Sequence, residues 1–199
     1  MKASIIDNRT KISPKLKFKT QEDVYILLAM ARKKDGTHKK NISSSDKRNP
    51  KYVMRRVLKN HSEFYPSVDY MIEESRRRWE KFRIYISVNP RSIHKAWFNM
   101  QIEVNNILKA NDPRFVDYIK DFSIEMKSLL HSPKSKSRAE YFLLDIDTKE
   151  DYSNPALELL VPTPNGHHGL IKPCNPKELH LPSYIELKTD AMILVYSNT

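Results

Sequence analysis

The chain of 199 residues has a single cysteine, Cys174, and only three glycines. One cysteine excludes an internal disulfide and any cysteine-rich zinc site. Long apolar runs are also missing: no stretch reaches the length that spans a bilayer, and the polar N-terminus lacks the apolar segment of a signal peptide. We therefore expect a soluble, cytoplasmic protein without a membrane partner, with a core large enough for one domain.

Acidic residues are in short supply relative to basic ones. The 24 Asp and Glu residues face 35 Lys and Arg, which gives a formal net charge of +11 and a pI near 9.6. A basic protein associates with polyanions because neutralising phosphates releases counterions. Nucleic acid and nucleotides are therefore the favoured partners, although many small intracellular proteins are basic without such a role.

Composition divides the chain into a short arm and one domain. Residues 1–20 are polar and basic and are interpreted as an arm, and residues 21–199 as a single domain. Helical patterns dominate about residues 50–130, and strand-like runs form sheet hairpins over about residues 140–196. The expected fold class is α+β, with a mixed or antiparallel central sheet and a helical N-terminal or inserted region.

Several elements of the first half can be predicted individually. The apolar run Val24–Ala31 is short and is predicted to be the strand that opens the core. The Ser-, Asn- and Lys-rich residues 37–50 predict an exposed loop. Residues 52–59 and 66–82 have helical patterns, and Arg83–Asn89 has the composition of a strand.

Two further helices are predicted from apolar residues at helical spacing. Ser92 can cap the first of them at its N-terminus, and the second covers about residues 113–130. Stripes at this spacing usually pack a core, so both helices are interpreted as scaffold.

The chemistry is concentrated in the apolar run Tyr141–Asp147, which ends in two carboxylates. In a strand, residues i and i+2 share a face, so Asp145 and Asp147 would project into one small volume. Two adjacent anions call for a cation, and hard oxygen ligands suit Mg²⁺ or Mn²⁺. The alternative is a strand that simply ends in an acidic turn.

Two of the three glycines flank a histidine pair in Asn165–Gly169. Asn-Gly predicts a type I′ turn that joins strands Leu157–Pro162 and His168–Lys172, because both central residues of that turn need positive φ. By alternation, His168 and Lys172 share one face, where an imidazole and an ammonium would suit a phosphate or a base edge. A surface hairpin with exposed histidines is the alternative.

Two strand-like runs, Tyr184–Lys188 and Met192–Tyr196, close the chain. Glu186 lies between apolar neighbours, and a carboxylate is costly to bury without a cationic partner. Glu186 therefore needs a metal or a lysine if its face of the strand is covered.

The order of these motifs resembles the catalytic core of archaeo-eukaryotic-type primases and primase-polymerases. The motifs are Ser87-Val88-Asn89-Pro90-Arg91, Leu143-Leu144-Asp145-Ile146-Asp147 and Asn165-Gly166-His167-His168, followed by an acidic strand. The resemblance implies an RRM-like core. It also implies that Asp145 and Asp147 are metal ligands and that a third acidic ligand is either Glu186 or Asp190.

The same resemblance implies a nucleotide-binding role for His168, in a stretch that includes Asn165. Lys172 is added as a triphosphate contact from strand alternation alone. The segment between Asp147 and His168 is shorter than expected for the family. The chain also resembles short phage proteins, which would place it in a host cytoplasm.

We therefore expect a nucleotidyltransferase of primase-polymerase type that depends on Mg²⁺ or Mn²⁺ and acts on nucleic acid and nucleoside triphosphates. A non-catalytic nucleic-acid-binding phage accessory protein is one alternative. A metal-dependent nuclease is another, because a two-metal centre serves both reactions. The sequence does not predict an oligomeric state.

Overall fold

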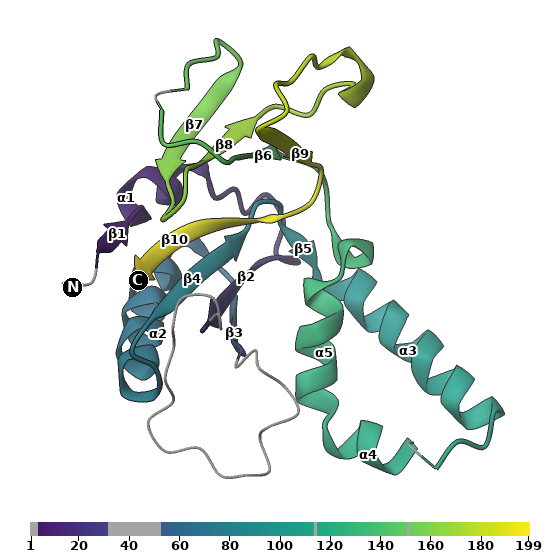
Figure 1. The fold of residues 1–199 in the computed structure, drawn as a ribbon. Helices are drawn as coiled ribbons and strands as arrows, with labels where there is room; N and C mark the ends of the chain where they lie inside the picture. The colour runs from purple at the N-terminus through teal and green to yellow at the C-terminus, as the bar shows by residue number, and fades with distance from the viewer. Residues whose placement is uncertain (1–3, 32–52, 114, 151) are drawn as a thin grey trace.

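The computed structural model describes residues 4–31, 53–113, 115–150 and 152–199. Its fold class is α+β, with two antiparallel sheets and several helices (Figure 1). The loop expected at residues 37–50 lies outside the described residues. No helix in the described ranges is long and apolar enough to cross a membrane.

The first sheet has six strands, with β5 paired to β2 beside the order β1-β10-β4-β2-β3. The strands are β1 (Ile5–Asp7), β2 (Asp23–Met30), β3 (Val53–Leu58), β4 (Phe82–Ser87), β5 (Arg91–Ser92) and β10 (Met192–Asn198). All of their pairings are antiparallel, and β2, which is predicted from its apolar run, is buried in the middle.

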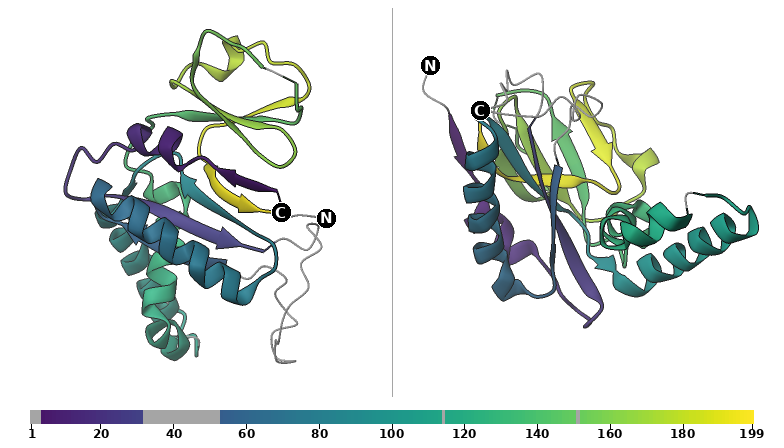
Figure 2. Two further views of the ribbon diagram at one scale, coloured as in Figure 1. Left: turned by 90° about the vertical axis from the view of Figure 1, so that its left-hand side faces the viewer. Right: turned by 90° about the horizontal axis from the view of Figure 1, so that it is seen from below.

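One face of the first sheet is covered by helix α2 (Phe64–Arg78). Val68 and Met71 of α2 belong to one buried core with Leu27 and Ile84 of the sheet. Figure 2 shows α2 on one side of the sheet, with the second sheet and the other long helices on the opposite side. The first sheet is therefore the middle layer.

The second sheet has the order β7-β8-β6-β9 and lies on the side away from α2. Its strands are β6 (Phe142–Ile146), β7 (Leu157–Pro162), β8 (His167–Ile171) and β9 (Ile185–Lys188). The strands expected around the two aspartates, the histidine pair and the acidic residue are thereby confirmed as neighbours in one sheet.

Helices α3 (Ile93–Lys109), α4 (Phe115–Lys120) and α5 (Phe122–His131) project from the first sheet (Figure 1). Ser92 caps α3 as predicted, by accepting a hydrogen bond from the Lys95 amide. The helices pack on the sheet where Ala96 and Leu129 meet Val24 and Ile26. In the part of the chain that the structure describes, the shorter helices are α1 (Arg9–Ile12) and the 3₁₀ turns Ser13–Lys15, His61–Glu63, Pro133–Ser135 and Pro176–Glu178.

Two buried asparagines join the sheets by hydrogen bonds. Asn8, which is 1% exposed, donates through Nδ2 to the carbonyl oxygens of Leu194 and Pro162. Asn89 accepts from the amides of Glu140 and Tyr141, and its Nδ2 donates to the Tyr141 carbonyl. Asn8 satisfies carbonyl groups of both sheets, and Asn89, which follows β4 of the first sheet, satisfies backbone groups directly before β6 of the second. These bonds hold the two sheets together.

Two expectations about secondary structure are wrong. Residues 53–58 form β3, and the helix predicted over residues 52–59 is absent, because this segment pairs with β2 along its length. The single helix predicted over residues 113–130 is two helices, α4 and α5, which are separated at Asp121.

The structure also revises two finer points. In the segment interpreted as a basic arm, Ile5–Asp7 pair with β10, and Ile12 and Leu16 are buried. Neither Asn165 nor Gly166 has the left-handed backbone of a type I′ turn, so the Asn-Gly turn chemistry is not the one predicted. A Cβ on Gly166 would lie 2.0 Å from the Ile146 carbonyl oxygen, so a close approach of two chains explains the glycine.

Candidate active site between the two sheets

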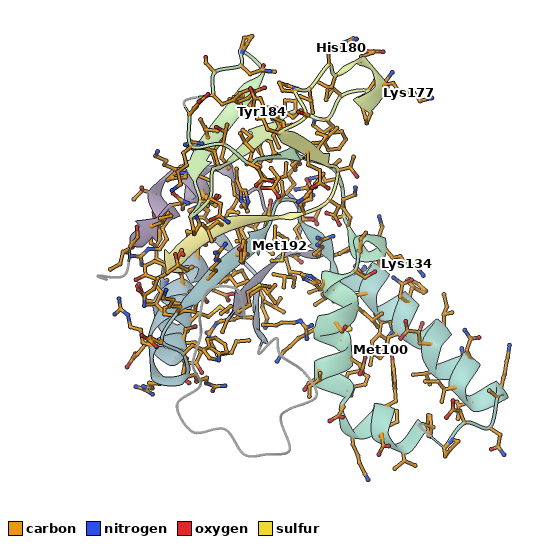
Figure 3. All side chains as sticks on the ribbon, viewed as in Figure 1. Met100, Lys134, Lys177, His180, Tyr184 and Met192 are labelled. Atoms are coloured by element: carbon orange, nitrogen blue, oxygen red, sulfur yellow. The ribbon has the colours of Figure 1, made fainter. Side chains whose placement is uncertain are left out.

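A cavity of about 480 Å³ lies between the two sheets, and we call it the interlayer cavity. The first sheet contributes Leu28, Met30, Arg83, Tyr85 and Met192, and the second contributes Leu143, Asp145, His168 and Lys188. Asp147, Thr163, Asn165 and Ala191 come from loops, and His131 comes from α5. Met192, labelled in Figure 3, lies at the start of β10.

The two aspartates of the apolar run both line the interlayer cavity, as alternation predicts. Asp145 is the fourth residue of β6, and Asp147 directly follows the strand and is exposed. The Asp147 amide donates to the Tyr184 carbonyl, which holds the chain in line with the strand. Asp145 lies between His168 and Glu186, which pair with it from the two strands that flank β6.

His168 connects the two sheets and faces the carboxylate at the same time. Its Nδ1 accepts a hydrogen bond of 3.1 Å from the Leu194 amide, and its Nε2 lies 3.5 Å from Asp145 Oδ1. With Nδ1 as the acceptor, the proton of a neutral ring is on Nε2 and points towards Asp145. Burial lowers the pKa of His168 to about 4, so the ring is neutral at pH 7.

Lys188 of β9 is the cation that Asp145 contacts. Its Nζ lies 2.5 Å from Asp145 Oδ2 and 3.1 Å from Glu186 Oε2. Although partial burial opposes protonation, the hydrogen bonds to these carboxylates raise the pKa of Lys188 above its usual value. The ammonium is therefore charged at neutral pH. Glu186 itself is exposed, so the condition under which it would need a cationic partner is not met.

Both candidates for a third acidic ligand point elsewhere. The Glu186 side chain is 70% exposed and does not line the interlayer cavity. Asp190 is buried and forms a salt bridge of 2.7 Å with the buried guanidinium of Arg91. The structure therefore assigns Asp190 to a structural pair.

Lys172 lies outside the interlayer cavity as well. Its ammonium is 4.6 Å from the centre of the Tyr141 ring, a cation–π contact beyond the end of β8. The face shared with His168 does not bring the two side chains together, because four residues along a strand span about 13 Å.

Sequence reasoning missed Arg83, Tyr85 and Lys188 as cavity residues. Alternation offered a signal for the first two, because Arg83 and Tyr85 are i and i+2 in a predicted strand and so share a face. Alternation does not indicate which face of this strand lies against the aspartates, because that depends on how the two sheets pack on each other.

The carboxylates suit a metal ion that brings some of its own ligands. Mg²⁺ is usually held by one or two carboxylates together with substrate phosphates, and Asp145 and Asp147 supply two. Within the described residues there is no group of three or more His, Cys, Asp or Glu side chains arranged to hold a metal. The donor set therefore fits a phosphate-bound Mg²⁺ or Mn²⁺ and does not fit an ion held by the protein alone.

The fold and the cavity define an α+β protein with a polar site between two antiparallel sheets. Comparison with known protein families, with curated proteins and with solved structures found no match to the chain. The resemblance to primase-polymerases therefore depends on the motifs and on the geometry described above.

Proposed function

We propose that this protein is a nucleotidyltransferase of primase-polymerase type, with an RRM-like catalytic core, that acts on nucleic acid and nucleoside triphosphates. One observation carries the proposal. Asp145 and Asp147 from one motif, and Asn165 and His168 from a second motif about 20 residues later, line the same cavity. These are four of the residues that the motif resemblance selects, and nothing in their local sequence requires that they meet.

In this proposal Asp145 and Asp147 hold Mg²⁺ or Mn²⁺ together with the phosphates of the nucleotide. The bound cation would neutralise the triphosphate and activate the attacking 3′-hydroxyl. Both carboxylates line the cavity, Asp145 from β6 and Asp147 from the residue directly after that strand, so they can act on the same ion.

The cationic side chains of the cavity fit the phosphates. Arg83 on the first sheet and Lys188 on the second line the cavity from both layers. In the enzyme–nucleotide complex, Lys188 would move from Asp145 to a phosphate oxygen as the metal takes its place beside the carboxylate. A guanidinium presents a planar fork that matches phosphate oxygens, and an ammonium acts as a point charge.

Asn165 and His168 have different roles in this scheme. The Asn165 amide lines the cavity from the loop before β8 and can both donate to and accept from a nucleotide. His168 is neutral and buried, so it orients Asp145 through Nε2–H and leaves phosphate charge to other residues. In this scheme, His168 therefore contributes by orienting the Asp145 carboxylate that binds the metal.

The test is incorporation of labelled nucleotides on primed and unprimed templates with Mn²⁺ or Mg²⁺. The Asp145→Asn variant is expected to lose incorporation while it keeps the thermal midpoint of unfolding, because Asp145 is at the cavity surface. Glu186→Gln is the matched control and is expected to stay active. If the purified wild-type protein adds no nucleotide to any template, the proposal is rejected; if it shortens the labelled strand, the centre is that of a nuclease.

The alternative is a nucleic-acid-binding protein without catalysis, and the ion pair between Asp145 and Lys188 favours it. An ammonium at 2.5 Å already neutralises this carboxylate, so the cavity is stable without a metal. This alternative predicts salt-sensitive binding that neither chelators nor Asp145→Asn changes. Metal-dependent nucleotide binding to the wild-type protein would exclude it.

A further inference from the structure

A second cavity, of about 370 Å³, lies at the outer edge of β3, the last strand of the first sheet. We call it the β3-edge groove. It is lined by Met54, Arg55, Arg56, Val57, Tyr70, Met71 and Lys127. The groove is distinct from the interlayer cavity and shares no lining residue with it.

Cations reach the β3-edge groove from both faces of the sheet. Arg55 and Arg56 are consecutive strand residues, so their side chains leave on opposite faces. Arg56 turns to the α2 side, where its guanidinium lies 4.8 Å from the centre of the Tyr70 ring. Arg55 pairs with Leu28, whose side chain lines the interlayer cavity, and Lys127 comes from α5 on that side.

Among the described residues, the groove contains no counter-charge. None of its described lining residues is acidic, and in the described ranges no carboxylate lies within salt-bridge distance of Arg55, Arg56 or Lys127. The Nε of Arg55 is buried without a hydrogen-bond partner. In contrast, Arg77 and Arg78 on α2 are paired with glutamates of their own helix.

Three cations without an acidic partner among the described residues favour an anion with several charges along its length. Guanidinium groups bind phosphate oxygens through two parallel hydrogen bonds. Tyr70 is half-exposed beside these cations, and aromatic rings next to a basic groove are typical stacking platforms for the bases of single strands. A backbone of phosphodiesters with unpaired bases has both features.

The groove also adjoins the candidate active site. The charge of Arg55 acts on His131, whose pKa is lowered by burial and by Arg55 and Arg91. His131 lines the interlayer cavity. Arg55 thus lies within electrostatic reach of the cavity wall, and a strand bound along the groove could continue towards the aspartates.

We propose that the β3-edge groove binds the backbone of single-stranded nucleic acid, with Arg55, Arg56 and Lys127 on the phosphates and Tyr70 stacked on a base. The proposal rests on the proposed function only in taking nucleic acid as the substrate. Binding requires neither nucleotide nor metal, so it can be measured when catalysis is absent.

The experiment measures the salt dependence of binding by fluorescence anisotropy, with a labelled oligothymidylate and a chelator present. The test variant is Arg55→Ser/Arg56→Ser, and the matched control is Arg77→Ser/Arg78→Ser, which removes the same net charge from paired arginines. Each lost phosphate contact lowers the slope of log K against log salt by about 0.7 for single strands, so the test variant is expected to lose about 1.4. The ratio of affinities at about 50 mM and about 200 mM salt then falls about sevenfold.

Two single variants keep the inference testable if the double variant does not fold. Arg56 is exposed, and Arg56→Ser is expected to lower the slope by about 0.7. Tyr70→Ala is expected to weaken binding about fivefold or more with the slope unchanged.

Equal slopes for the test and control variants would overturn the inference, as would tighter binding of a hairpin duplex than of the single strand. Asp145→Asn separates this inference from the proposed function. If the wild-type protein adds no nucleotide but still binds the single strand in a way that depends on Arg55, the binding role of the groove is supported and the proposed polymerase activity is rejected. If the Arg55→Ser/Arg56→Ser variant still incorporates nucleotides and its binding is unchanged, the proposed activity is supported and the binding role of the groove is rejected.

Discussion

Removal of the Asp190 side chain should cost much more stability than removal of Glu186, although both are acidic residues near the candidate site. Asp190 and Arg91 have side chains that are 8% and 2% exposed, and they form a salt bridge of 2.7 Å. In Asp190→Ala, the Arg91 guanidinium stays buried with one weak contact described, to the Ser132 carbonyl at 3.5 Å. Breaking a buried pair in this way costs about 3–5 kcal/mol.

The corresponding fall in the thermal midpoint is about 6–20 °C for a chain of this length. Glu186→Ala is the control, because that side chain is 70% exposed and its loss should change stability by no more than about 0.5 kcal/mol. Urea denaturation monitored by circular dichroism gives both free energies of unfolding. Replacing both partners, as Arg91→Met with Asp190→Leu, should recover most of the loss because no buried charge is left unpaired.

A decrease of less than about 1 kcal/mol in the free energy of unfolding of Asp190→Ala would contradict this role of the ion pair, because an unpaired buried guanidinium destabilises a protein by more than that. A second contradictory result would be a variant with unchanged stability and no metal-dependent activity. That result would make Asp190 the third metal ligand, and the salt bridge would then be a feature of the metal-free state only.

Two further predictions concern how the second sheet is held. His168→Ala should destabilise the protein by about 1–3 kcal/mol in urea denaturation, because the buried Leu194 amide loses its acceptor, whereas Lys172→Ala should have little effect; equal effects would contradict the assigned roles. Gly166→Ala should cost about 1–3 kcal/mol, because the added Cβ would lie 2.0 Å from the Ile146 carbonyl oxygen and the loop must shift; a variant as stable as the wild type would show that this approach is not tight.

The parts of the fold that depend on local rules could be predicted from the sequence. The buried strand β2, the Ser92 cap and the shared orientation of Asp145 and Asp147 each follow from neighbouring residues alone. Strand β3 could not be predicted, because the apolar residues of Val53–Leu58 recur at helical spacing. Its state is set by pairing with β2, more than 20 residues earlier in the chain.

The candidate site shows the same division between local and distant causes. From the sequence, Asp190 is a candidate metal ligand, because it lies beside predicted strand residues. In the structure its carboxylate is bound by Arg91, which is 99 residues away in sequence. Which cation meets Asp145 depends on the register of β9, which places Glu186 opposite Asp145 and Lys188 within reach of both. The register between β9 and β6 cannot be predicted from the sequence pattern of either strand.

The charge balance of the interlayer cavity connects its structure to a metal requirement. Its charged lining residues are Arg83 and Lys188 against Asp145 and Asp147, and His168 is neutral at pH 7. A cavity with no net charge gives little attraction for a triphosphate, because each phosphate that approaches one of the cations also approaches a carboxylate. A divalent cation held by the aspartates would reverse that balance, and Lys188 would then be available to the phosphates. The ion pair seen here therefore explains how the cavity is stable without a nucleotide, and why, in the proposed reaction, nucleotide and metal should bind together.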